Sequence, residues 1–235
     1  VILKKNNYLF VDGRYTIQAH QECSKNFNIV EIHKKLPHKV IKNYNLGYDP
    51  SLFTSNTLNK YFTHNKLVSI SQNLVDEISI FKEKKTKPFY SLGKKIVGET
   101  HKSKISKVVK FLISKQADYL FVSAPENVSW LLNIRGYDSP NSPISNARLI
   151  IDKNKKIYLI AEKTKMFNII KEKKIKKDQV INNSDFLILI NNLSGKNIII
   201  DDKTCSIFYE NIVKKKFKIL KLNDPIYKLK SIKNI

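Results

Sequence analysis

Arginine is rare in this sequence, and Arg14 lies where a side chain could be held in place for recognition. Residues 11–21, VDGRYTIQAHQ, predict a strand that runs into a tight turn and then a helix. A guanidinium fixed at such a junction can pair with a carboxylate or a peptide carbonyl of a ligand. An ordinary ion pair with Asp12 or Glu22 is the competing interpretation.

Motifs that carry catalysis in many enzymes are missing from the sequence. Its six glycines are scattered and form no phosphate-binding loop, and the patterns G-x-S-x-G, H-E-x-x-H and C-x-x-C do not occur. No histidine has carboxylates at the spacing of metal ligands, so we predict surface positions for His20, His33, His38, His64 and His101. We therefore predict no catalytic and no metal-binding residue in this chain.

Two other pairs of residues have a simple structural interpretation. Asp201 and Asp202 follow a predicted strand, where paired carboxylates can bind a metal, but a turn into the next helix accounts for them more simply. Cys23 and Cys205 lack the spacing of a zinc site or a disulfide framework. We expect two buried thiols in a reducing, cytoplasmic environment.

A stretch of the second half is unusually rich in residues that serve binding sites. Residues 123–151 hold the one tryptophan, Trp130, two of the three arginines, Arg135 and Arg148, and the turn-rich loop YDSPNSP. Packing of Trp130 beside Leu131 in a core and a place for Trp130 in a site are equally compatible with this pattern.

The charge of the chain is high and has a compositional explanation. The formal net charge is +23, and all but three of the 43 Lys and Arg residues are lysine. Abundant Lys, Asn and Ile is typical of A/T-rich codons, whereas arginine, which suits phosphates and base edges, is scarce. We therefore expect no specific nucleic-acid partner, and no apolar run reaches the roughly 18 residues of a membrane span.

Strand and helix patterns alternate along the chain, which is typical of an α/β sheet. Residues 1–4 and 8–11 predict a hairpin, residues 38–44 a helix, and Ser51 the N-cap of a helix over 51–62. The charged segment 82–87, followed by Pro88, predicts a domain boundary. Beyond it we expect a helix over 101–116 capped by Thr100 or Ser103, and a hairpin formed by 147–152 and 156–161.

Five segments, in the same order, resemble the N-terminal, non-catalytic part of Xaa-Pro aminopeptidases (aminopeptidase P) of the creatinase/prolidase superfamily. These are LFVDGRYTIQAHQE, LGYDPSL, NLVDEI, ENVSWLLNIRGYDSPNSPISNARLII and DPIYKLKSIKN. The resemblance implies two consecutive creatinase N-terminal-like α/β domains with a ribonuclease H-like motif, the first truncated at its start. Their expected limits are 1–83 and 84–222, with 223–235 as a linker toward a missing pita-bread metallopeptidase domain.

The resemblance also implies a function for the longer protein. The missing domain would hold two divalent metals, usually manganese, on two Asp, one His and two Glu, and would release the first residue of X-Pro peptides. Arg14 matches the family arginine that contacts the bound peptide. The present chain would be inactive alone, would shape substrate access, and would offer contacts for a homo-oligomer.

Several alternatives stay open at the level of sequence. A stand-alone creatinase-like binding or scaffold domain would keep the fold without the enzyme. Prolidase and creatinase-type amidinohydrolases are rivals within the superfamily, and a nucleic-acid binder would show its lysines gathered on one face.

Overall fold

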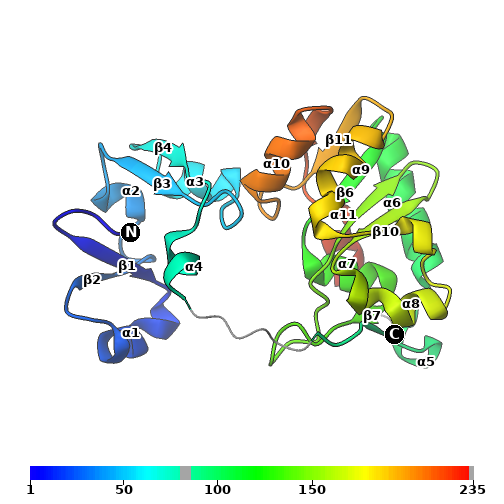
Figure 1. The fold of residues 1–235 in the computed structure, drawn as a ribbon, viewed down its shortest axis with the longest axis horizontal. Helices are drawn as coiled ribbons and strands as arrows, with labels where there is room; N and C mark the ends of the chain where they lie inside the picture. Colours follow the sequence, from blue (N-terminus) through cyan, green and yellow to red (C-terminus); the bar gives the residue numbers. More distant parts are fainter. Residues whose placement is uncertain (80–85, 233–235) are drawn as a thin grey trace. The chain divides into compact units, whose positions relative to one another are not determined.

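A computed structural model describes residues 1–79 and 86–232 of the chain (Figure 1). The Cα positions divide it into two units, Val1–Glu77 and Ile78–Ile235. Residues 82–85, most of the charged segment predicted as the boundary, lie outside the described residues. The predicted domain limits of 1–83, 84–222 and 223–235 stay a prediction, and each unit is described by itself.

The first unit alternates short strands with short helices. Its elements are β1 (Asn7–Val11), the 3-10 turn η1 (Gly13–Tyr15), α1 (Thr16–Glu22), β2 (Phe27–Glu31), α2 (Pro37–Val40), β3 (Asn45–Tyr48), α3 (Ser55–Tyr61), β4 (Lys66–Ser69) and α4 (Leu74–Ile78).

The strands of this unit pair in parallel, so the predicted N-terminal hairpin is wrong. Strand β1 pairs with β2, with Leu9 opposite Ile29, and β3 pairs with β4. Residues 1–4 form no strand; Asn7 Oδ1 accepts a hydrogen bond from Leu3 N at 3.0 Å and closes a loop instead. Parallel neighbours need a crossover between them, and α1 supplies it between β1 and β2.

Two helices of the first unit begin or end differently from the prediction. Helix α3 is capped by Thr54, whose Oγ1 accepts from Thr57 N at 3.1 Å, whereas Ser51 N bonds Asp49 Oδ1 in the preceding turn. Helix α2 stops at Val40 because Ile41 is extended, and Asn43 then adopts a positive φ of 63°.

The second unit contains a six-stranded sheet between helices. Its elements are β5 (Tyr90–Ser91), α5 (Lys94–Val97), α6 (His101–Ser114), β6 (Tyr119–Val122), α7 (Pro125–Leu132), β7 (Ile134–Arg135), β8 (Arg148–Asp152), β9 (Ile157–Ile160), η2 (Lys163–Met166), α8 (Phe167–Lys171), η3 (Lys177–Gln179), β10 (Val180–Ile181), η4 (Asn183–Asp185), α9 (Phe186–Asn192), β11 (Asn197–Ile200), α10 (Ile207–Lys214), β12 (Lys218–Lys221) and α11 (Pro225–Ser231).

The sheet has the order β10-β9-β8-β6-β11-β12. Only β8 runs against its neighbours, and it forms the predicted hairpin with β9, in which Leu149 lies opposite Leu159. Thr100, one of the two predicted caps, begins α6 by accepting from Ser103 N. The α/β class expected from the alternating pattern is thus confirmed.

Both faces of this sheet are covered by helices. Leu120 and Val122 of β6 belong to one buried cluster with residues of α6, α7 and α11, whereas Tyr119 and Phe121 belong to a second cluster with residues of α9 and α10. Successive side chains of a strand point to opposite faces, so four consecutive residues supply both cores.

The segment that follows β12 forms a helix packed on the second unit. Helix α11 lies against α6 and α7, and its Ile226 is fully buried. Asp224 caps it through a hydrogen bond from Ile226 N to Oδ1 at 2.9 Å. Over 225–231 the predicted linker is therefore helical; its path toward a further domain stays a prediction.

We expect Leu120→Ala to lower the free energy of unfolding of the second unit by about 2–5 kcal/mol, because it leaves a cavity in the first buried cluster. Ile113→Ala on α6 is the matched control, since that side chain is 61% exposed, and its effect should stay within about 0.5 kcal/mol. Urea unfolding of the two variants checks this; equal destabilisation would contradict the assigned core.

Candidate functional site

Arg14 stands on a turn that is fixed by its own neighbours. Strand β1 ends at Val11, Asp12 caps the turn η1, and α1 begins at Thr16. Asp12 Oδ1 accepts from Arg14 N at 3.0 Å and from Arg14 Nε at 2.8 Å, while Thr16 Oγ1 donates to Gly13 O. The local sequence DGRYT therefore builds the turn and orients the guanidinium together.

Gly13 lets the turn approach the loop after β2. A Cβ at this position would lie 3.0 Å from Cε1 and 3.3 Å from Nδ1 of His33. The His33 ring in turn lies 3.2 Å from the Glu31 carboxylate. The small residue before Arg14 is thus explained by this close approach.

The Arg14 side chain is 80% exposed and directed to solvent by its pairing with Asp12. Their mutual hydrogen bond lowers the pKa of Asp12 and raises that of Arg14, so the pair stays charged at neutral pH. Glu22, the other predicted partner, instead accepts from Gln18. Of the three guanidinium nitrogens of Arg14, only Nε has a partner within residues 1–79 and 86–232, and both terminal nitrogens are open to a ligand.

A shallow pocket of about 330 Å³ lies beside this turn. It is formed by side chains of β1 and α1 together with Tyr15. The Arg14 guanidinium carbon is 5.8 Å from the centre of the Tyr15 ring, which is 53% exposed. An exposed guanidinium next to an aromatic ring and a hollow can bind a carboxylate or a peptide carbonyl; it has no group that could break a bond.

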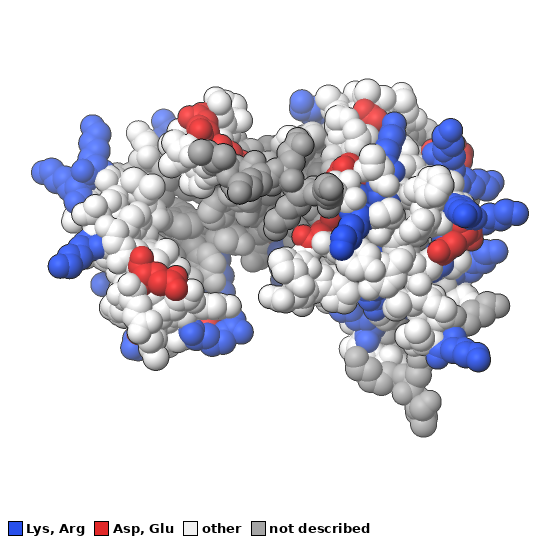
Figure 2. All heavy atoms as spheres, turned by 60° about the horizontal axis from the view of Figure 1, so that its bottom comes forward, with Lys and Arg blue, Asp and Glu red and all other residues white. Residues whose placement is uncertain are grey.

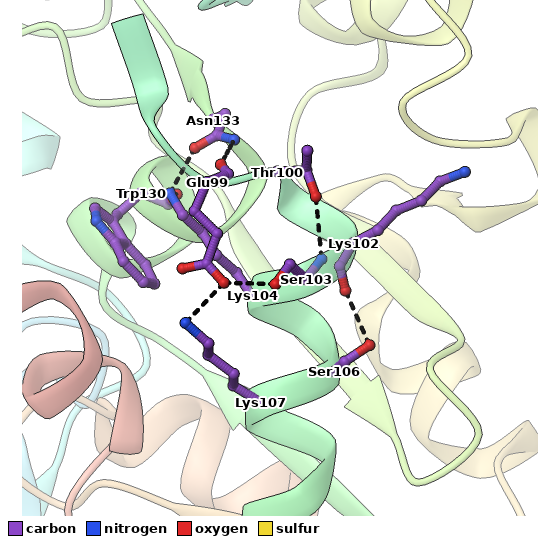
Figure 3. A network of polar contacts seen from close by, with 9 residues as sticks. All are labelled: Glu99, Thr100, Lys102, Ser103, Lys104, Ser106, Lys107, Trp130 and Asn133. Atoms are coloured by element: carbon purple, nitrogen blue, oxygen red, sulfur yellow. Dashed lines mark hydrogen bonds and ion pairs between the residues drawn. The ribbon is translucent and has the colours of Figure 1, made fainter. Parts of the chain in front are cut away.

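Trp130, the other candidate from sequence, is part of a structural network (Figure 3). It packs against the first buried cluster, and the Lys104 ammonium lies 3.9 Å from the centre of its ring. Lys104 Nζ also donates to Trp130 O at 2.9 Å and to Asn133 Oδ1 at 2.6 Å. The core-packing interpretation of Trp130 accounts for these contacts.

Lys104 is the residue that reasoning from sequence missed. It is only 3% exposed, and burial lowers its pKa to about 8. It lies four residues before Val108 on the apolar stripe of α6, a spacing that could have placed it on the buried face. Its partner Asn133 ends α7 in a left-handed conformation, φ 54°, and donates to Glu99 O.

The remaining arginines also have structural partners. Arg135 Nη1 donates to Ile134 O at 2.8 Å and to Ser129 O at 3.3 Å. The Arg148 guanidinium carbon lies 4.5 Å from the centre of the Tyr209 ring. Neither joins Trp130 in an open site, so residues 123–151 stabilise the fold through all three side chains.

Asp201, the first aspartate after β11, stabilises the turn that sequence predicted. Asp201 is buried, and its two oxygens accept from Lys203 N and Asp224 N. In the part of the chain that the structure describes, no three or more His, Cys, Asp or Glu side chains form a group that could hold a metal. Cys205 is buried, whereas Cys23 is half-buried, and both are free thiols.

The histidines lie on the surface, and the lysines of one face are mixed with other residues. None of the five histidines is buried, as predicted, although His38 and His101 are half-buried. On the face drawn in Figure 2, Lys and Arg are interspersed with Asp, Glu and uncharged atoms. Among the described helices, none has the length and apolar content needed to cross a membrane.

These features define an α/β protein with a sheet covered on both faces in its second unit and an exposed arginine, Arg14, on a turn of its first unit. The sequence matches the family described as Creatinase/Prolidase N-terminal domain over residues 80–235, more than half of the chain. The chain belongs to this family.

Curated relatives agree with this assignment. The chain is 29% identical over 181 residues to the probable Xaa-Pro aminopeptidase P of Laccaria bicolor, covering 68% of this chain and 27% of the relative. It is 26% identical over 258 residues to Xaa-Pro aminopeptidase 1 of Dictyostelium discoideum, covering 100% of this chain and 41% of the relative. The chain thus spans less than half the length of these relatives.

A solved structure shows the same fold. The X-prolyl aminopeptidase of Caenorhabditis elegans, described as a cytosolic enzyme with a di-nuclear active site, superposes with a TM-score of 0.81 and 21% identity. The match covers 99% of this chain and 41% of that enzyme. The family match and the curated relatives confirm the resemblance to the N-terminal part of aminopeptidase P, and the solved structure confirms the two-domain α/β fold.

Lys104 should give the stability of the second unit a distinct dependence on pH. The unfolded chain holds the proton up to pH 10.5, whereas the folded protein releases it near pH 8, so wild-type stability gains from this group as pH rises between these values. The Lys104→Met variant lacks this gain. The free energy of unfolding of the wild type minus that of the variant should therefore be larger at pH 10 than at pH 7.

Urea unfolding at the two pH values measures this difference. Lys102→Met, at an exposed position of the same helix, is the control. Its difference from the wild type in the free energy of unfolding should be the same at both pH values. A Lys104→Met difference that does not change with pH would show that the buried amine keeps its ordinary pKa.

Proposed function

We propose that this chain is the non-catalytic N-terminal portion of an enzyme that releases the first residue of X-Pro peptides. The exposed Arg14, fixed by Asp12 and with both terminal nitrogens open, carries the proposal. It lies in a chain related to Xaa-Pro aminopeptidases over its length. Arg14 would bind a peptide carbonyl or carboxylate from the non-catalytic side.

The geometry supports a positioning role for Arg14. The hydrogen bond from Arg14 Nε to Asp12 Oδ1 restricts the guanidinium before a peptide arrives, and the bond from Arg14 N to the same oxygen fixes the backbone of the turn, so less side-chain entropy is lost on binding. The Arg14 charge persists at every physiological pH, so its contribution to binding would not titrate there.

The di-nuclear centre implied by the relatives does not fit the described residues of this chain, which offer no suitable ligand group. We assign no reaction step to this chain. Divalent metal, expected to be manganese, would belong to the further domain, and this chain would shape access of the peptide and provide contacts for a cytoplasmic homo-oligomer.

The 235-residue chain should not hydrolyse an X-Pro peptide in the presence of a manganese salt, because the residues that the structure describes form no group of ligands that could hold a metal. Release of the first residue, followed by chromatography against a metal-only blank, measures this. Turnover clearly above that blank would contradict the proposal that this chain is non-catalytic.

Arg14→Ala, introduced into the protein together with its metal-binding domain, should lower kcat/KM for an X-Pro peptide by roughly tenfold or more, since a charge-assisted contact is lost. Lys34→Ala is the matched control, because it removes another exposed ion pair of the same unit, that with Glu31. An unchanged kcat/KM for Arg14→Ala would leave Arg14 with the structural pair to Asp12 only. A separate test is the sequence encoded after residue 235 in the same reading frame. If it lacks the two Asp, one His and two Glu that would bind the metals, the scaffold alternative is favoured.

A further inference from the structure

The second unit has a groove at the edge of its sheet where β11 and β12 end. Its volume is about 840 Å³, within the range of small-molecule pockets. The strands β6, β11 and β12 are parallel, so their carboxyl ends meet at this edge. Open α/β sheets bind ligands outside the carboxyl ends of their strands.

One wall of the groove is apolar and partly aromatic. Phe111 of α6 faces the groove together with Pro225, Tyr227 and Leu229 of α11. Tyr227 is held by a hydrogen bond from its hydroxyl to Glu126 at 2.7 Å. Fixed aromatic walls favour a flat apolar body over a polar one.

The carboxylates at the base of the groove are occupied by the fold. All four oxygens of Asp201 and Asp224 accept hydrogen bonds, from Lys203 N, Asp224 N, Ile226 N and the Asn127 side chain. Both residues are 4% exposed. They do not present free acceptors to a ligand.

The exposed charges that line the groove are cationic. Lys107 is paired with Glu99 at 2.8 Å, and Lys203 Nζ donates to the neutral Asn223 side chain. Within the described residues, neither Lys203 nor Lys228 has a carboxylate within 4.0 Å. Two unpaired ammonium groups therefore border an aromatic wall.

We propose that this groove binds a small organic anion, one carboxylate-like group attached to an apolar ring. The ring packs on Phe111 and along Tyr227, whose ring centre also has the Lys230 ammonium 4.4 Å away. The anionic group lies between Lys203 and Lys228. Two cations are too few for the many phosphate contacts of a nucleic acid, which excludes that class. Because its walls come from α6, the loop after β11 and α11, a bound anion would hold α11 against the unit.

The test compares two probes that share a ring system. 1-Anilinonaphthalene-8-sulfonate carries an anionic group, and N-phenyl-1-naphthylamine lacks it. Fluorescence titration of the 235-residue chain should show one sulfonate site per chain, with affinity roughly tenfold or more above that of the neutral probe.

The double variant Lys203→Gln/Lys228→Gln should lose this preference for the sulfonate. Lys173→Gln/Lys177→Gln removes the same charge from the exposed segment after α8 and should keep it. Thermal unfolding shows whether each variant is folded. If Lys203→Gln/Lys228→Gln does not fold, the single variants Lys203→Gln and Lys228→Gln are tested in its place. Equal affinity for the two probes, or equal loss in both double variants, would overturn the proposal. It does not depend on peptidase activity of the longer protein.

Discussion

The second unit depends on the burial of its central strands on both faces. The four residues of β6 alternate between two cores, and β8 and β11 follow the same alternation, since Ile150 and Ile198 belong to one cluster and Leu149 and Ile199 to the other. A sheet covered on both sides must be apolar along whole strands, and it leaves polar groups only at strand ends. The groove proposed to bind an anion accordingly lies at the edge of the sheet, between residues of α6, α11 and the loop after β11.

Polar groups that do enter the interior are held by partners from distant segments. Lys104 joins α6 to the end of α7 through Trp130 and Asn133, and Asp224 joins the start of α11 to β11 and α7 through Asp201 and Asn127. Burial raises the pKa of Asp224 to about 6, the opposite direction from the lowered pKa of Lys104, because burial disfavours each charge. Such residues specify which helices pack together, because a buried polar group needs one particular partner whereas apolar contacts can form with several.

The first unit shows the contrasting case, in which exposure makes a residue available. Its short parallel strand pairs bury few side chains, and the turn after β1 holds Arg14 in solvent with its Nε bound to Asp12. A guanidinium that is oriented locally and unpaired at its terminal nitrogens suits recognition of a partner brought to it. The proposed peptide contact of Arg14 and the proposed anion groove of the second unit both rest on exposed cations that keep N–H donors open to a ligand.

The sequence by itself determined the features that depend on near neighbours. The turn at Asp12–Tyr15, the Thr100 cap, the β8–β9 hairpin, the α/β alternation and the family resemblance all follow from residues close together in the chain. Only the tertiary structure decided the parallel pairing of β1 with β2, the burial of Lys104 and the occupation of Asp201 by Asp224 N. These depend on contacts between residues far apart in sequence, where a local pattern is compatible with several partners. For the same reason the structural role of Trp130, left open by the sequence, was settled by Lys104, a residue 26 positions away.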